Sequence, residues 1–189
     1  MGAAWARELG GRVTSESGLS VRIERDPPAH LLPFERFFRG FADLPPVREL
    51  FGRQTRTVLR NLKVEFFASK FGYMGTSDVD GHLLISTHHL KTGEFRVLYL
   101  DLYHELCHVR QFRQGKPLFY PRLDYVDAPS EIDAYRKTIA EGRRIGMTDR
   151  ELVDYLRMDW LDAREHRRLA RRMGLKVPAR RRRAARNRR

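Results

Sequence analysis

His104-Glu105-Leu106-Cys107-His108 is the stretch around which the fold and the chemistry of this chain are organised. Residues four apart project from the same face of a helix, about 5–6 Å apart at Cβ, so both imidazole rings can reach one metal ion at roughly 2.0–2.1 Å. Glu105 points about 100° further round the helix, which makes it a poor third ligand but lets it reach a water molecule beside that ion. The pentapeptide therefore predicts half of a metal site with a general base next to it.

Chance is a weak explanation for the pentapeptide. With 7 His and 12 Glu among 189 residues, a shuffled chain is expected to contain about 0.016 matches to HExxH. The sequence around the motif predicts one amphipathic helix of about 20 residues, because Gly115 and Pro117 follow as a stop signal and apolar residues recur at helical spacing, namely Phe95, Leu98, Leu102, Val109 and Phe112. The alternative is a solvated helix face that carries two incidental histidines.

The position of a third ligand decides between these interpretations, because a catalytic zinc ion usually takes three protein ligands. In the metzincin pattern HExxHxxGxxH, the glycine and the third histidine would fall on Gln111 and Gln114, which excludes that layout. The other layout has a glutamate on a following helix, and Glu131 begins a helical stretch 23 positions after His108. We therefore expect Glu131 to be the third ligand.

At these positions the chain resembles the gluzincin branch of the zincin metallopeptidases, through the HExxH pentapeptide and an E-x-x-A segment at 131–134. The resemblance implies an α+β zincin-like fold, in which a small, twisted, mainly antiparallel sheet packs on the HExxH helix and a second helix provides the third ligand. Carried over to this sequence, His104, His108 and Glu131 would bind one Zn²⁺ ion per chain, and Glu105 would be the general base and later the general acid. The implied reaction is hydrolysis of peptide bonds in a protein or peptide substrate.

The group that orients the first histidine is left open by the sequence. Thermolysin-like gluzincins carry an aspartate four positions after the ligand glutamate, where this chain has Tyr135. Asp101 and Asp124 are the candidates for that role, and Asp133 is expected to face elsewhere. Tyr135 itself shares the helical face of Glu131, so it is either a hydrogen-bond donor to the transition state or a half-buried tyrosine in the helix interface.

Other residues near the motif are weaker candidates. Tyr120 and Tyr125, in the loop between the two helices, are equal alternatives for the transition-state donor. His88 and His89 end an apolar run that is expected to be a strand, so one of them can face the site, although exposed histidines without a role are commoner. Cys107 is expected to pack as a small hydrophobe rather than bind the metal.

Length and composition indicate one compact domain over residues 1–174, followed by a basic disordered tail over 175–189. The single cysteine excludes an internal disulfide framework and a separate cysteine-based zinc finger, and it fits a reducing compartment. No apolar run reaches the roughly 18 residues of a membrane span, and residues 1–11 lack the apolar region of a signal peptide. We therefore expect a cytoplasmic protein.

Positive charge is concentrated at the C-terminal end of the chain. Residues 164–189 hold 13 of the 37 Lys and Arg residues and one acidic residue, so this segment carries +12 of the net charge of +13. Its arginines cannot form a core and need an anionic partner. Nucleic acid is the leading candidate because phosphate contacts release counterions, while an acidic protein, an anionic membrane and a tail that only aids solubility are the alternatives.

Local patterns predict the remaining elements. We expect a strand at 21–23, a short aromatic-rich helix at 34–41, a helix at 47–61 and strands at 63–74 and 82–87. A last helix starts at the Thr148/Glu151 capping box and ends at Gly174, with an apolar stripe that is expected to face the core, namely Leu152, Tyr155, Leu156, Trp160, Ala163 and Leu169. Residues 83–87 are the expected edge strand for pairing with substrate backbone. On the helix of Glu131, Ala134 is small enough for close approach to the HExxH helix, and Asp127 or Ser130 can cap the start.

Two functional hypotheses of different class follow. The first is a zinc metallopeptidase that its Arg-rich C-terminus brings to nucleic acid. The alternative is a nucleic-acid-binding protein that uses a zincin scaffold without peptidase activity. Replacing Glu105 by Gln abolishes function only under the first hypothesis, whereas removing 175–189 does so under the second.

Overall fold

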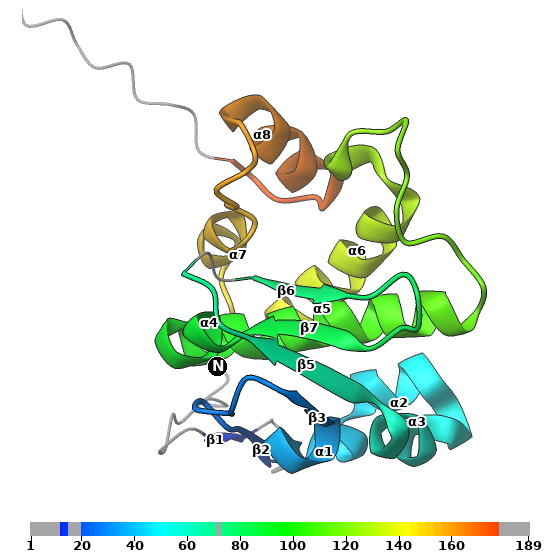
Figure 1. Ribbon diagram of the computed structural model, residues 1–189. Coiled ribbons are helices and arrows are strands. Elements are labelled where there is room, and N and C mark those ends of the chain that lie inside the picture. The colour runs from blue at the N-terminus through cyan, green and yellow to red at the C-terminus, as the bar shows by residue number, and fades with distance from the viewer. Residues whose placement is uncertain (1–11, 15–19, 71–72, 178–189) are drawn as a thin grey trace, which may run out of the picture.

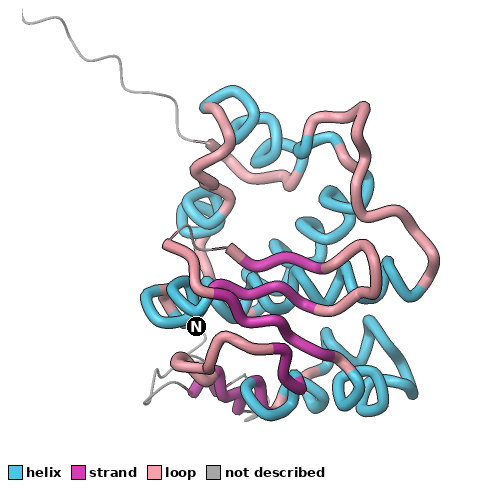
Figure 2. Tube along the Cα trace, in the orientation of Figure 1, coloured by secondary structure: helices cyan, strands magenta, loops and turns pink. Residues whose placement is uncertain are grey.

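The computed structural model describes residues 12–14, 20–70 and 73–177. A mixed sheet at the centre of the molecule has four strands, β3 (Leu31–Pro33), β5 (Lys63–Phe67), β6 (Met74–Thr76) and β7 (Leu83–Ser86). Their order is β3–β5–β7–β6, with β5 and β7 parallel and the other two pairings antiparallel (Figures 1 and 2). With the surrounding helices this makes an α+β fold with a mainly antiparallel sheet, as predicted.

The strand order corrects the prediction of a long strand at 63–74 and of the free edge. β5 ends at Phe67, and Met74 opens the separate strand β6, which pairs on the outer side of β7. β7 therefore lies between two neighbours, and the prediction that 83–87 forms the edge is wrong. The edge strand on this side of the sheet is β6, whose three residues include Gly75 and are too few to show the period-two pattern of a strand.

A smaller antiparallel sheet lies on the N-terminal side, in the order β1 (Arg12–Thr14), β2 (Ser20–Ile23) and β4 (Phe38–Arg39). The strand predicted at 21–23 is confirmed as part of β2. The helix predicted at 34–41 is shorter, because α1 (Phe34–Phe37) runs into β4 and a 3-10 turn, η1 (Phe41–Asp43), follows. The aromatic residues of this stretch are buried against one another and against Phe66, namely Phe34, Phe37, Phe38 and Phe41.

Two short helices replace the single helix predicted at 47–61. They are α2 (Pro45–Phe51) and α3 (Thr55–Asn61), separated by the 3-10 turn η2 (Gly52–Gln54). Gly52 has a φ of 56°, a left-handed value that glycine adopts readily and that interrupts the α-helix. Val47, Leu50, Val58 and Leu59 face inward and are buried, and Phe51 is half-buried against the same core.

The HExxH motif lies on α5 (Phe95–Arg113), which at 19 residues agrees with the predicted length. α5 lies behind the mixed sheet (Figure 1), and α6 (Pro129–Arg144) packs against α5. Ala134 on α6 is fully buried, in keeping with its predicted place at a close helix contact. Neither Asp127 nor Ser130 caps α6, because Ala128 is the N-cap and has no side-chain acceptor. Pro129 begins the helix instead, since the first helical position needs no N–H donor.

The C-terminal helical region was predicted correctly at its two ends but not in between. The capping box of Thr148 and Glu151 is present, and Gly174, with a φ of 68°, follows the last helix. Between these points the chain forms two helices, α7 (Asp149–Tyr155) and α8 (Ala163–Arg172). The break has a local cause, because Asp162 and Glu165 form a second capping box that starts α8.

The linker between α7 and α8 exposes Trp160, which was wrongly predicted to face the core and is 57% exposed. After α8, Leu175 still packs in the core. Within the described part of the chain, no helix is long and apolar enough to cross a membrane. Residues 1–11 and most of the predicted basic tail, 178–189, lie outside the described residues.

Close packing of α6 generates a first prediction. A Cβ added at Gly142 would lie 2.5 Å from Cδ2 of Leu152 on α7 and 3.3 Å from Cδ1 of Leu100 on α5. Overpacking costs roughly 1–3 kcal/mol and replacing Gly by Ala in a helix gains about 1 kcal/mol, so the net cost is at most about 2 kcal/mol. We expect Gly142→Ala to lower the free energy of unfolding by about 1–2 kcal/mol in urea denaturation.

Gly75→Ala is the matched control, because a Cβ added there meets no atom within 4 Å. It should not lower the free energy of unfolding. Equal stability of the wild-type protein and Gly142→Ala would contradict the tight contact between α6 and its neighbours.

Candidate metal centre

Three potential ligands converge where α5 meets the first turn of α6. Nε2 of His104 lies 3.0 Å from Nε2 of His108, and these two atoms lie 3.3 and 3.4 Å from the carboxylate oxygens of Glu131. Ligands placed tetrahedrally at about 2.0–2.1 Å from an ion are roughly 3.3 Å apart. His104, His108 and Glu131 therefore form a group that can hold a metal ion, and the structure brings together the three residues predicted to do so.

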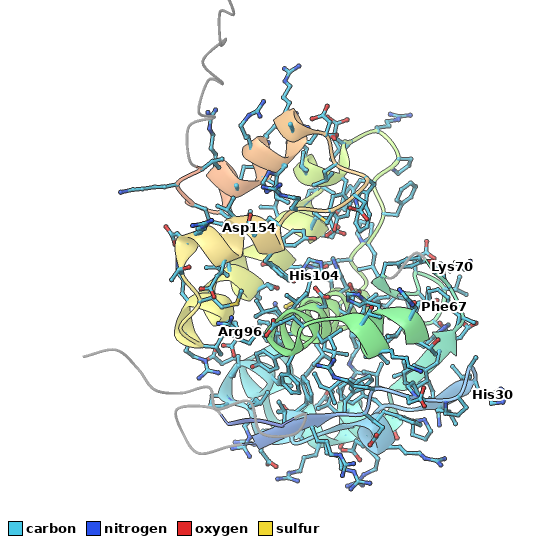
Figure 3. All side chains as sticks on the ribbon, turned by 90° about the vertical axis from the view of Figure 1, so that its left-hand side faces the viewer. His30, Phe67, Lys70, Arg96, His104 and Asp154 are labelled. Carbon is cyan, nitrogen blue, oxygen red and sulfur yellow. The ribbon has the colours of Figure 1, made fainter. Side chains whose placement is uncertain are left out.

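The fold fixes this convergence from two sides. α5 presents both histidines on one face through their four-residue spacing, and both are only 5% exposed. Figure 3 shows His104 in the interior, below helix α7, which carries Asp154, and above Arg96 near the start of α5. Glu131 is the third residue of α6, so the packing of α6 on α5 delivers its carboxylate to the histidines.

One oxygen of the group is left without a hydrogen bond. Oε2 of Glu131 is buried and has no hydrogen-bond partner among the described residues, and its contact with Nε2 of His104 at 3.3 Å is an ion pair only when that imidazole is protonated. A buried, unpaired carboxylate oxygen is costly in free energy, and a bound cation would satisfy it. The unpaired oxygen and the chemistry of the donor set both fit a metal ion.

The charges of the three potential ligands and of the neighbouring Glu105 also favour binding of a cation. Burial alone would raise the pKa of Glu131, but contact with His104 and His108 holds that pKa well below its usual range. Burial opposes charge on His108, yet Glu131 and Glu105 raise its pKa to about 9. A proton on His108 competes with a metal ion for the same site, so metal affinity is expected to fall as the pH falls through this range.

Glu105 lies beside the three ligands. Its Oε2 accepts a hydrogen bond of 2.9 Å from the hydroxyl of Thr76, so strand β6 holds the carboxylate in place. Burial raises the pKa of Glu105, while the neighbouring His108 and His104 oppose that rise. A buried carboxyl group with a raised pKa at a metal site is suited to accept and return a proton near neutral pH.

Gln111 orients one of the histidines. Its Oε1 lies 2.9 Å from Nδ1 of His108, which leaves Nε2 of that ring for a metal, and its amide donates to Asp133 and to the Ser130 carbonyl oxygen at 3.1 and 3.0 Å. Such hydrogen bonds fix the orientation of a metal-binding ring. Asp133 itself contacts neither histidine, as predicted, and supports the second one only through Gln111. Gln111 was not predicted, although its position three residues after His108 places it on the same helical face.

Neither aspartate predicted to orient His104 does so. Asp124 is at the surface, where it pairs with an arginine of α8, and Asp101 binds Nε2 of His89 at 2.7 Å. Among the described residues, Nδ1 of His104 has no hydrogen-bond partner. The ring of Tyr135 packs on this imidazole instead, with their centroids 4.2 Å apart, so packing holds the first histidine where a hydrogen bond holds the second.

The tyrosines near the site differ in where they point. Tyr135 is buried, and its hydroxyl bonds with the Tyr125 hydroxyl at 2.9 Å and with Sδ of Met158 at 3.2 Å. These protein partners favour a packing role for Tyr135 over a role as donor to the transition state. Tyr125 lines the cavity at the site, whereas Tyr120 is not among the residues that line it.

The remaining residues that the sequence offered as weaker site candidates lie on α4 (Thr87–Thr92) and α5. His88 and His89 lie on α4 and do not end a strand, because the Ser86 side chain caps that helix. His88 is exposed, whereas His89 faces the cavity. Cys107 is 1% exposed and burial raises the pKa of its thiol, in agreement with packing as a small hydrophobe.

The three potential ligands lie at a cleft that has two hollows. The outer hollow, about 370 Å³, contains His104, His108 and Glu131 and is bounded by β6 and by Phe119 in the loop after α5. The inner hollow, about 220 Å³, extends from His104 towards α4 and the linker between α7 and α8. Residues shared by both hollows join them into one cleft, namely Tyr73, Met74, His104, Glu105, Tyr125 and Trp160. A substrate can therefore reach the ligands and Glu105 together.

Comparison with known proteins found no matching family model, no matching curated protein and no matching solved structure. The likeness to gluzincins is therefore carried by the motif residues alone. Assignment of a function depends on the geometry of the three ligands, Glu105 and the cleft.

The contact between Gln111 and His108 generates a second prediction. Loss of a hydrogen bond that orients a metal-binding histidine typically lowers metal affinity about 10- to 100-fold. We expect that loss in Gln111→Ala, measured by competition with a chromophoric chelator. Gln114→Ala is the matched control, since Gln114 is exposed at the end of the same helix. Equal affinities of the two variants would contradict the orienting role.

Proposed function

We propose that this protein is a zinc-dependent metallopeptidase. The observation that carries the proposal is the convergence of His104, His108 and Glu131 beside Glu105 on the wall of an open cleft. Two imidazoles and one carboxylate are a ligand set that suits zinc, and three protein ligands leave a coordination position free for chemistry. A structural zinc site would instead be closed by four protein ligands.

Residues of this chain have separate roles in the proposed hydrolysis. A bound zinc ion supplies Lewis-acid polarisation of the peptide carbonyl and lowers the pKa of a water molecule. Glu105 takes a proton from the attacking water and returns it to the leaving amine, while Thr76 holds its carboxylate. The raised pKa of Glu105 suits both steps, since the group has to be protonated and deprotonated in each turnover.

Strand β6 supports a polypeptide as the substrate. It is the edge of the mixed sheet, and Gly75 and Thr76 line the outer hollow next to the ligands. An extended chain can pair with such an edge through backbone hydrogen bonds, which positions a peptide bond without regard to its side chains. Thr76 lies on the same strand, so one element would place both the substrate and the general base.

Glu105→Gln tests the proposal directly. The variant should keep one zinc ion per chain and the wild-type unfolding temperature, and it should lose at least about 100-fold in kcat on a quenched fluorescent peptide mixture, because general-base catalysis contributes roughly 10²–10⁴-fold. Glu35→Gln, at an exposed position on α1, is the matched control and should retain full activity. Peptide hydrolysis that survives in Glu105→Gln would disprove the mechanism.

A second activity, nucleic-acid binding, is favoured by the arginines of the C-terminal segment. On α8, Arg164, Arg167 and Arg171 are exposed along one face, and no ion pair joins them to an acidic residue in the described ranges. Sequence adds seven further arginines within 178–189. We propose nucleic acid as the partner of residues 164–189, either to bring the peptidase to its substrates or, in the alternative function, as the sole activity of a zincin-like scaffold.

Removal of residues 178–189 tests this partner. The truncated chain should bind a labelled ~20-nucleotide DNA at least about tenfold more weakly, and its affinity should fall less steeply between about 50 and 200 mM salt, because fewer phosphate contacts release fewer counterions. Fluorescence anisotropy measures both quantities, and zinc content and peptidase activity of the truncated chain serve as controls. If the dependence of DNA affinity on salt concentration is unchanged in the truncated chain, residues 178–189 do not contact the nucleic acid.

A further inference from the structure

Exposed aromatic side chains gather at the cleft. Among the described residues, six large apolar side chains are exposed, and three of them line the cleft, with exposures of 45% for Tyr73, 71% for Phe119 and 57% for Trp160. They come from three separate segments, next to β6, after α5 and between α7 and α8, so folding alone brings them together. A group of exposed apolar side chains marks a binding surface.

Strand β6 restricts what this surface can bind. It is an edge strand whose residues line the outer hollow together with Tyr73, so backbone hydrogen bonds are offered at the same place as the aromatic contacts. A flat protein surface or a lipid bilayer cannot enter a concave cleft and use a strand edge. An extended polypeptide can do both, with alternate side chains turned towards the cleft walls.

The inner hollow is walled by aromatic rings. Five rings face it, those of Tyr73, Tyr125, Tyr135, Tyr155 and Trp160. The rings of Tyr125 and Trp160 meet edge to face at 87°, with centroids 6.3 Å apart, which is a favoured aromatic arrangement. At about 220 Å³ the hollow is smaller than the roughly 300–1,000 Å³ of pockets for whole drug-sized ligands, so its size suits a single side chain.

Both an aromatic and a cationic side chain can bind against rings. The charged residues of the lining are largely occupied by other contacts, since the carboxylate of Asp101 lies 2.7 Å from Nε2 of His89 and Arg157 pairs with Asp154 at 3.4 Å. Glu105 and Asp159 also line the hollow. The rings, together with the apolar side chains of Met74, Val97 and Met158, favour an aromatic side chain, and a lysine peptide tests the cationic alternative.

We propose that the inner hollow is a specificity subsite that takes an aromatic side chain of an extended polypeptide next to the bond that is cut. The inference rests on the proposed peptidase function, because His104 and Glu105 border both hollows and thus place the reacting bond at their junction. Trp160 is the residue on which the preference depends most, since it is exposed, borders both hollows and contacts the ring of Tyr125 in the wall.

Binding to inactive protein tests the subsite apart from catalysis. The protein is full-length, zinc-loaded Glu105→Gln, and the probes are fluorescein-labelled decapeptides of Gly and Ser that carry Phe, Ala or Lys at one central position. We expect the Phe peptide to bind at least about tenfold more tightly than the Ala and Lys peptides by fluorescence anisotropy, a ratio typical of a hydrophobic subsite. Adding Trp160→Ala should remove that preference while zinc content stays at one per chain.

Leu31→Ala in the same background is the matched control. Leu31 is also an exposed apolar residue, but β3 lies at the opposite edge of the sheet from β6, so the preference for Phe should remain. Equal binding of the three peptides, tighter binding of the Lys peptide, or a Phe preference that survives Trp160→Ala would each overturn the proposal. Failure of the proposed function would be seen separately, as absence of hydrolysis by wild-type protein that binds the Phe peptide tightly.

Discussion

The close approach of α6 to α5 is the constraint on which the candidate site depends. Two histidines on one helix can be brought to an ion by helical geometry alone, but Glu131 reaches them only if a second helix packs at short range. Small residues on α6 permit that distance, because Ala134 is fully buried and a Cβ added at Gly142 would lie 3.3 Å from Cδ1 of Leu100 on α5. The sheet on the other side of α5 completes the arrangement, because Thr76 on β6 reaches Glu105. One helix contact and one strand contact thus bring three potential metal ligands and the carboxylate of Glu105 to one cleft.

This arrangement is better explained by chemistry than by stability. Burying a carboxylate and two imidazoles costs free energy, and the unpaired Oε2 of Glu131 leaves part of that cost uncompensated by the protein. The hydrogen bonds from His108 through Gln111 to Asp133 hold a ring in the orientation that a metal requires. Aromatic residues exposed at the cleft add a further cost in water. A bound cation and a substrate would supply the missing contacts.

Sequence reasoning recovered the parts of the structure that depend on local periodicity. The HExxH helix, the helix of Glu131 and the Thr148/Glu151 capping box were predicted because their patterns extend over several turns or follow fixed spacings. The edge strand β6 was missed because three residues cannot show a period. The role of Gln111 was missed because the partner of its amide, Asp133, is 22 positions away in sequence and is brought near only by helix packing. The exposure of Trp160 likewise follows from a helix break that a continuous apolar stripe conceals.

Metal stoichiometry is the most direct test of the central claim that α5 and α6 together hold one ion. Elemental analysis of dialysed protein compares the wild type with Glu131→Ala, which removes only the ligand that α6 contributes. The account predicts one zinc ion per wild-type chain and a clear loss in the variant, with the unfolding temperature of the zinc-free proteins similar. A wild-type chain that binds no metal under zinc-replete conditions, or a Glu131→Ala chain that retains a full equivalent, would contradict it.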